Sequence, residues 1–193
     1  AFSHKYKNDG FVCMTYLGDG AVNQGQVYES FNMSALWNLP VIFIIENNKY
    51  GMGTSVDRAS AGSSLADRGK AYGIPGMEVD GMNIFSVREA GKEALDFTRS
   101  GKGPYILEMK TYRYRGHSMS DPAKYRTRSE VDAVRQQKDC IENLKEVLQE
   151  QKVTDQELKN IDGEIKSLVT NASDFALDSK LPDENELLTD IYL

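Results

Sequence analysis

The sequence predicts an α/β fold, in which a doubly wound and mainly parallel sheet is followed by a C-terminal helical hairpin. Short apolar runs alternate with helix-length amphipathic stretches over residues 1–128, whereas the pattern from residue 129 onward is helical throughout. Alternating strands and helices with short connections are typical of a sheet covered by helices on both faces. We therefore expect an α/β domain at residues 1–128 and a helical tail at residues 129–193 packed on it.

The composition indicates a globular chain that does not enter a membrane. Hydrophobic residues make up 40% of the 193 residues and charged residues 27%, which are ordinary globular values. No run approaches the roughly 18 apolar residues of a membrane helix, and no apolar export signal follows Lys5 and Lys7. Cys13 and Cys140 lack ligand-like spacing, so we expect buried thiols rather than a disulfide or a metal site.

The first predicted elements form a βαβ unit. Residues 11–17 and 41–45 are short runs rich in β-branched and aromatic residues, as in strands that are buried on both faces. Pro40 ends the helix between them. The apolar face of that helix repeats every four residues and consists of Val27, Phe31 and Ala35.

Two further helices and two further strands complete the predicted domain. The strands are a weak pattern at residues 77–79 and a stronger one at residues 105–109. Capping boxes predict the starts of both helices, and their members are Ser64 with Asp67 and Ser86 with Glu89. The second helix has an apolar face made of Val87, Ala90, Ala94 and Phe97.

The acidic tail is predicted to form two helices. The apolar face of the first consists of Val134, Ile141, Leu144 and Leu148. A break near residues 151–153 precedes a capping box of Thr154 and Glu157. The apolar face of the second consists of Leu158, Ile161, Ile165, Leu168 and Ala172. We expect this hairpin to support the sheet structurally, and the alternative is a surface for another subunit.

The sharpest functional signal is the Gly18-Asp19-Gly20 turn between the first strand and the first helix. Glycines let the backbone approach a ligand, and the helix start beyond them offers unpaired amides to a phosphate. Asn47-Asn48 follows the next strand, and in a parallel sheet both turns lie at the same edge. A carboxylate, an amide oxygen and a main-chain carbonyl there suit Mg²⁺ bound to a diphosphate.

Four stretches closely resemble the alpha subunit of the pyruvate dehydrogenase component of the 2-oxo acid dehydrogenase complexes. The stretches are GDGAVNQGQVYESFNM, ENNKYGMGTSVDRA, VDGMNIFSVREA and TYRYRGHSMSDPAKYRT. The resemblance runs from about Phe11 to the end and is loosest in the tail. The Gly-Met-Gly-Thr-Ser run at residues 51–55 favours pyruvate over branched-chain 2-oxo acids as the substrate.

The resemblance implies the thiamine diphosphate-binding fold, with thiamine diphosphate and Mg²⁺ as cofactors. Asp19, the Asn48 side chain and the Tyr50 main-chain carbonyl would then bind the metal. Gly18, Gly20 and Ala21 would contact the diphosphate, and the catalytic residue His117 would approach it from another loop. Ser118 and Ser55 match positions that kinases modify in relatives.

The resemblance also implies partners and a location. Family members assemble as two alpha and two beta subunits, oxidatively decarboxylate pyruvate, and pass the acetyl group to a lipoyl domain of the dihydrolipoyl acyltransferase core. Bacterial cytoplasm and the mitochondrial matrix both fit. Family alpha subunits are longer, so we expect this chain to lack their N-terminal part and to have little activity alone.

Alternatives remain open from the sequence. An acetoin or other 2-oxo acid dehydrogenase subunit would have a similar pattern, as would an inactive cofactor-binding fragment. The basic, tyrosine-containing segment at residues 110–128 could bind nucleic acid. We do not expect a nucleic-acid partner, because the chain has a net charge of −6 and a diphosphate site is predicted beside that segment.

Overall fold

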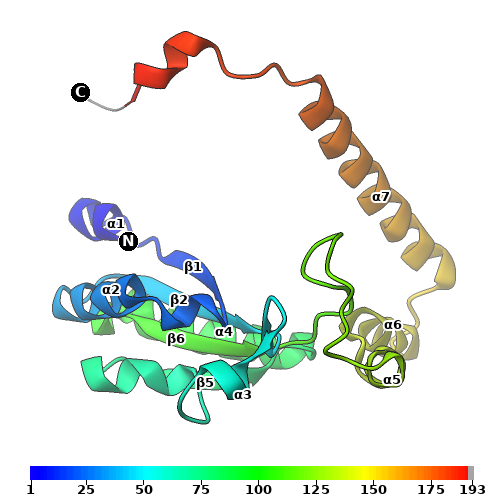
Figure 1. Ribbon diagram of the computed structural model, residues 1–193, viewed down its shortest axis with the longest axis horizontal. Coiled ribbons are helices and arrows are strands. Elements are labelled where there is room, and N and C mark those ends of the chain that lie inside the picture. Colours follow the sequence, from blue (N-terminus) through cyan, green and yellow to red (C-terminus); the bar gives the residue numbers. More distant parts are fainter. Residues whose placement is uncertain (191–193) are drawn as a thin grey trace. The chain divides into compact units, whose positions relative to one another are not determined.

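The computed structural model describes residues 1–190 and confirms the predicted α/β fold. The chain divides into two compact units, Ala1–Asn143 and Leu144–Leu193. Figure 1 shows the order of their helices and strands along the chain. Among residues 1–190, no helix combines the length and the apolar character needed to cross a membrane.

Parallel strands form the sheet of the first unit. Their order across the sheet is β1 (Cys13–Gly18), β2 (Val41–Asn47), β6 (Tyr105–Lys110) and β5 (Gly76–Asp80). The central strands β2 and β6 are buried along nearly their whole length. At one edge of the sheet, the exposure of successive β1 residues alternates, and Met14 and Tyr16 are 50% and 59% exposed.

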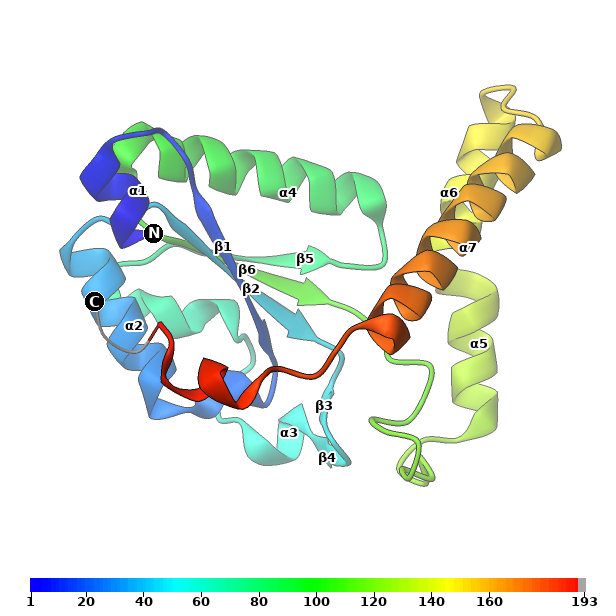
Figure 2. The same cartoon turned by 90° about the horizontal axis from the view of Figure 1, so that it is seen from above.

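Helices cover both faces of this sheet, as Figure 2 shows for α2 (Gly25–Leu36) and α4 (Ile84–Phe97). One apolar cluster joins α2 to β2 through Phe31, whose ring lies 4.8 Å from that of Phe43. The other cluster joins α4 to the opposite face through the buried Ala90 and Ala94. The predicted apolar faces of both helices are therefore confirmed.

Shorter elements complete the first unit. They are α1 (Phe2–Lys7), β3 (Tyr50–Gly51), β4 (Thr54–Ser55), α3 (Val56–Ala59) and α5 (Arg128–Lys138), together with 3-10 helices at Ala21–Asn23 and Ala66–Tyr72. Strands β3 and β4 pair in an antiparallel fashion. A π-helical turn, Thr98–Lys102, follows α4. Neither Cys13 nor Cys140 forms a disulfide, and both are half-buried.

Both capping boxes predicted in this unit are wrong. Residues 66–72 form a 3-10 helix, and the amides at its start bond to Glu108 on β6 instead of to Ser64. Helix α4 begins earlier than predicted, because the Asn83 side chain accepts hydrogen bonds from the amides of Phe85 and Ser86. At the first place Glu108 accepts from the amides of Leu65 and Ala66, and at the second the N-cap is Asn83, three residues before Ser86.

The tail is helical as predicted, but its first helix is divided. Asp139 separates α5 from α6 (Cys140–Glu150), because its side chain caps the amides of Ile141 and Glu142. Helix α7 (Asp155–Asp178) has the predicted capping box of Thr154 and Glu157. A 3-10 helix follows at Glu184–Leu188.

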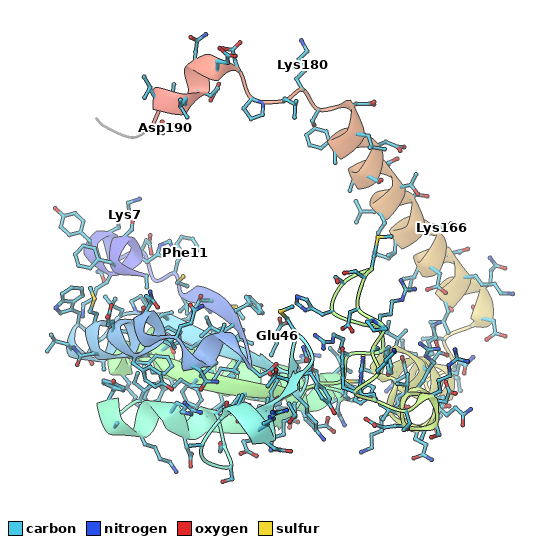
Figure 3. All side chains as sticks on the ribbon, viewed as in Figure 1. Lys7, Phe11, Glu46, Lys166, Lys180 and Asp190 are labelled. Carbon is cyan, nitrogen blue, oxygen red and sulfur yellow. The ribbon has the colours of Figure 1, made fainter. Side chains whose placement is uncertain are left out.

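No residue of α7 is buried, and Figure 3 shows Lys166 extending from it. The packing of a hairpin on the sheet stays a prediction.

Candidate functional site

The candidate site lies where β1 and β2 end. The strands are parallel and in register at Gly18 and Glu46, and Glu46 is labelled in Figure 3. Asp19 and Asn47, the residues that follow these two, therefore lie beside each other. The carboxyl ends of adjacent parallel strands are where ligands bind in open α/β sheets.

The Asp19 carboxylate faces the turn that follows β2. It is 3% exposed, and a Cβ added to Gly51 would lie 4.0 Å from its Oδ2 atom and 3.4 Å from the Gly20 Cα. Burial raises the pKa of Asp19, while its own amide, the Asn48 amide and the charge of Arg113 act in the opposite direction. Gly20 and Gly51 thus approach each other closely beside this carboxylate and place no side chain of their own there.

Side-chain hydrogen bonds shape the turn at residues 47–50. Asn47 Oδ1 accepts a hydrogen bond from the Lys49 amide at 3.0 Å, and Asn48 Oδ1 accepts one from the Tyr50 amide at 3.2 Å. Lys49 adopts a left-handed backbone conformation with φ of 72°. Tyr50 then pairs with Ser55 in the β3–β4 ribbon. The turn thus brings the Asn48 side chain and the Tyr50 main chain to the strand end that bears Asp19.

These groups are chemically suited to Mg²⁺. Asp19, Asn48 and Tyr50 offer a carboxylate, an amide oxygen and a main-chain carbonyl, all of them hard oxygen donors. Within residues 1–190, no cluster of three or more His, Cys, Asp or Glu side chains forms a metal site. A site with a single carboxylate suits a cation that keeps waters and substrate phosphates as its other ligands.

The start of the following helix lies directly beside Asp19. Ala21 begins the 3-10 helix Ala21–Asn23, and α2 begins at Gly25. Amides at such a start lack acceptors within the helix and attract anions. The predicted diphosphate-contacting residues Gly18, Gly20 and Ala21 are therefore continuous with the predicted metal ligand Asp19.

His117 lies in the loop after β6, and Arg113 connects it to the β3–β4 turn. The His117 side chain is exposed, and its Nδ1 atom lies 3.4 Å from Arg113 Nη1. Arg113 Nη2 donates to the Met52 carbonyl at 2.6 Å and to the Tyr125 hydroxyl at 2.9 Å. Arg113 also acts on Asp19 electrostatically. One guanidinium therefore links His117, the β3–β4 turn and the buried carboxylate.

Asp121 holds the loop around His117. Its carboxylate accepts hydrogen bonds from the amides of His117 and Ala123 at 2.7 and 2.8 Å, and from the Tyr125 hydroxyl at 2.8 Å. These bonds lower the pKa of Asp121 to about 2. A Cβ at Gly116 would lie 2.6 Å from the Asp121 carbonyl oxygen, so the loop closes too tightly there for a side chain.

Arg126 anchors the far end of the same loop. It is 9% exposed, and its Nη2 atom donates to the Arg115 carbonyl at 2.9 Å. Its guanidinium lies 5.2 to 5.8 Å from the ring centres of Tyr50, Tyr112 and Tyr125. Cation–π contacts of this kind are strongest where water is excluded. Two of the three tyrosines considered for base stacking, Tyr112 and Tyr125, therefore pack around an arginine.

The two candidate regulatory serines differ in exposure. Ser118 is exposed beside His117, and its Oγ atom lies 3.0 Å from Ser120 Oγ. Ser55 is half-buried at the start of α3. Ser118 is therefore the more accessible of the two to a modifying enzyme.

Sequence reasoning missed Glu108 and assigned no role in the cofactor site to Arg113, Asp121 or Arg126. Arg113 and Arg126 were counted among the basic residues of their segment, and Asp121 was noted as its one acid. Glu108 is 1% exposed in β6, between Leu107 and Met109. The signal that could have identified Glu108 is a single carboxylate within an apolar strand, because such a group is almost never buried without partners.

Comparison with known proteins identifies the relatives of this chain. A sequence model described as "Dehydrogenase E1 component" matches residues 1–185. The chain is 54% identical over 193 residues to a protein of Zymomonas mobilis named "Pyruvate dehydrogenase E1 component subunit alpha". It is 56% identical over 194 residues to a Rhizobium meliloti protein of the same name. A mitochondrial protein of Dictyostelium discoideum with that name is 51% identical over 195 residues.

All of this chain is covered in each comparison, together with 54%, 56% and 51% of the respective relative. The chain thus spans about half the length of these relatives.

Proposed function

The chain belongs to the dehydrogenase E1 component family, and we propose that it acts as part of the alpha subunit of a pyruvate dehydrogenase that uses thiamine diphosphate and Mg²⁺. The observation that supports this most directly is the buried Asp19 carboxylate, which faces Gly51 at the ends of two parallel strands. A buried carboxylate without a matched cation is costly, and a bound Mg²⁺ would remove that cost.

The proposed metal ligands are Asp19, the Asn48 side-chain oxygen and the Tyr50 main-chain carbonyl. Gly18, Gly20 and Ala21 contribute main-chain groups to the diphosphate, and the lack of side chains at both glycines lets it approach closely. Bound thiamine diphosphate supplies the electron sink that decarboxylation of a 2-oxo acid needs. The protein's part is to hold the cofactor and orient the reacting groups.

His117 contributes a directed hydrogen-bond donor. Arg113 Nη1 can only donate, so the neighbouring Nδ1 atom of His117 acts as the acceptor. The neutral ring then carries its proton on Nε2, which is left to donate toward the diphosphate or the substrate. Asp121 fixes the His117 backbone by accepting its amide hydrogen bond. Together these contacts hold the His117 backbone and favour the tautomer whose proton is on Nε2.

The proposed partners follow from the alpha-subunit role. A beta subunit would complete the cofactor site in an assembly of two alpha and two beta subunits. Pyruvate would be the substrate, and a lipoyl domain of an acyltransferase core would accept the acetyl group. The named relatives come from bacteria and, in one case, a mitochondrion, so a bacterial cytoplasm or the mitochondrial matrix is the proposed location.

The test is a calorimetric titration of thiamine diphosphate with Mg²⁺, with and without a beta subunit. Asp19→Asn keeps the shape of the side chain and removes the charge that binds the metal. We expect it to weaken Mg²⁺-dependent binding by at least about 100-fold, because changes even to residues outside the ligand shell cost 10- to 100-fold. Asp96→Asn, which removes an exposed carboxylate from α4, is the matched control.

Unchanged binding by Asp19→Asn would exclude Asp19 as a ligand. Turnover of the alpha–beta assembly with pyruvate, other 2-oxo acids and acetoin then identifies the substrate. Activity with acetoin but not with pyruvate would contradict the proposed reaction, and cofactor binding without any turnover would indicate a noncatalytic module.

A further inference from the structure

We infer that Glu108, a residue in the centre of the sheet, is a positioning residue for the metal site. It holds the turn that bears Asn48 and Tyr50, and it does so through Asn47. This inference rests on the proposed function, because it assigns a role toward the Mg²⁺ that those residues would bind. Within residues 1–190, the Glu108 carboxylate accepts hydrogen bonds from Asn47 and from residues 64–66, and its link to Asn48 and Tyr50 is indirect.

Glu108 is a carboxylate surrounded by donors. Its Oε1 atom accepts a hydrogen bond from Asn47 Nδ2 at 2.7 Å. Its Oε2 atom accepts hydrogen bonds from the Leu65 and Ala66 amides at 2.7 and 3.0 Å, and the Ser64 hydroxyl lies 3.4 Å away. With 1% exposure, the side chain is shielded from water. In each of these contacts, the Glu108 carboxylate is therefore the hydrogen-bond acceptor.

Asn47 passes this constraint to the turn. Its Nδ2 group is committed to Glu108, so its Oδ1 atom is fixed in the direction of the Lys49 amide, 3.0 Å away. Its main-chain oxygen accepts a hydrogen bond from the Thr111 amide at 2.9 Å. Asn47 is 9% exposed and has little freedom to turn. The conformation of Lys49, and with it the direction of Asn48 and Tyr50, depends on this asparagine.

The geometry requires a carboxylate at position 108. In Glu108→Gln, one oxygen becomes an NH₂ donor. If the remaining oxygen keeps the Leu65 and Ala66 amides, the new NH₂ group faces Asn47 Nδ2, and two donors oppose each other. If Asn47 rotates its amide to relieve this, its NH₂ group faces the Lys49 amide instead. Either arrangement leaves the turn without one of its hydrogen bonds, and the opposite orientation of the new amide opposes its NH₂ group to the Leu65 and Ala66 amides, which also hold the network.

An exchange of the two side-chain types should restore the network. In the double variant Asn47→Asp, Glu108→Gln, one oxygen at position 47 accepts from the new amide and the other accepts from the Lys49 amide. The oxygen at position 108 still accepts from Leu65 and Ala66. The net charge of the protein is unchanged, because the negative charge is only transferred from position 108 to position 47. The single variant Asn47→Asp places two carboxylates face to face, so it should be defective.

The experiment measures the Mg²⁺ dependence of thiamine diphosphate binding by calorimetry, in the full-length subunit assembled with its beta partner. Thermal unfolding is followed in parallel. We expect Glu108→Gln and Asn47→Asp each to weaken Mg²⁺ binding by about 10- to 100-fold, the usual effect of losing a group that orients a metal ligand. The double variant should recover to within about threefold of the original affinity.

Controls separate positioning from folding. Glu78→Gln removes the carboxylate that pairs with Lys110 at the end of β6, and its Mg²⁺ affinity should not change. Asn47→Ala leaves the bonds of Glu108 to Leu65 and Ala66 in place, so it tests the link to the turn even if Glu108→Gln fails to fold. It should also weaken Mg²⁺ binding by about 10- to 100-fold.

Two results would overturn the inference while the proposed function stands. One is normal Mg²⁺ affinity in folded Glu108→Gln or Asn47→Ala protein, whatever the melting temperature. The other is failure of the double variant to recover affinity when each single variant has lost it. If the original protein binds no Mg²⁺ and thiamine diphosphate, the proposed function fails first and this role of Glu108 fails with it.

Discussion

The carboxylates of Glu108 and Asp121 both hold backbone segments by accepting hydrogen bonds, but they lie in very different surroundings. Each carboxylate accepts hydrogen bonds from at least three donors, two of which are main-chain amides. Glu108 is buried in the middle of the sheet and joins segments that are 42 to 61 residues apart. Asp121 lies in a surface loop, and its partners are two to four residues away.

The difference shows that the two halves of the candidate site have separate carboxylate anchors, and Arg113 links the two halves. The half formed by the turn after β2 is part of the fold, because its anchor also fixes the start of a 3-10 helix and lies against the core. In the half that contains His117, the Asp121 anchor contacts only residues of its own loop. Local contacts of this kind can open without unfolding the domain, and loops that bind ligands are often drawn from such regions.

The largest expected effect is on folding stability. Glu108→Ala leaves the Asn47 side chain and two buried amides without acceptors, and each such loss costs about 1–3 kcal/mol. We expect the free energy of unfolding, measured by urea denaturation, to fall by at least about 3 kcal/mol. Asp121→Ala is the matched variant, and it should change this quantity far less because its donors can turn to water. If Glu108→Ala and Asp121→Ala lost equal free energies of unfolding, the proposed difference between the two carboxylates would be wrong.

The next effect is local opening of the loop. Asp121→Asn replaces an acceptor oxygen with a donor, so the amides of His117 and Ala123 lose part of their protection. Hydrogen exchange at these two amides should accelerate by roughly tenfold or more, which corresponds to the loss of about one hydrogen bond. Exchange at the β6 amide of Leu107 serves as the internal control and should stay slow. Acceleration throughout β6 would mean that the loop is coupled to the core.

A pH titration tests whether the charged form of Asp121 stabilises the loop that contains His117. The pKa of Asp121 is lowered from its ordinary value of 3.8 to about 2 by the bonds that its charged form accepts. A lowered carboxyl pKa means that the stabilisation is fully present above about pH 5 and is lost as the pH falls through 3.8 toward 2. Protection of the His117 amide should follow this profile. In Asp121→Asn, the protection of the His117 amide should no longer depend on pH in this range. If the pH dependence persisted in this variant, another titrating group would be its cause.

The smallest expected effect on stability comes from Ser118→Glu. The side chain is exposed, so the free energy of unfolding should change by less than about 0.5 kcal/mol. The added negative charge beside His117 should nevertheless weaken thiamine diphosphate binding, as a phosphate of about −2 charge would do more strongly. Ser129→Glu, at the start of α5, is the control with the same charge change. Unaltered binding and activity in Ser118→Glu would argue against regulation at this serine.

The sequence was sufficient for features with a local or periodic signal. The central strands and the apolar faces of α2 and α4 follow from hydrophobic spacing, and so does the meeting of the Asp19 and Asn48 turns once a parallel sheet is assumed. The capping box of Thr154 and Glu157 was likewise predictable, because both partners lie within one turn of helix.

Contacts between distant segments could not be predicted in the same way. The amides at Leu65 and Ala66 bond to Glu108, which lies 42 to 43 residues further along the chain. Arg113 reaches Met52 across 61 residues. No spacing rule connects such positions, so the predicted serine cap was wrong and the anchor of the turn after β2 was missed.

The edge strand β1 has a practical consequence for anyone who produces this chain. An edge strand has backbone donors and acceptors that face away from its sheet, and here the exposed Met14 and Tyr16 add apolar surface beside them. Such an edge is a template on which another strand can be added. Solutions of the isolated chain should therefore be kept dilute and checked for concentration-dependent association before any binding measurement is interpreted.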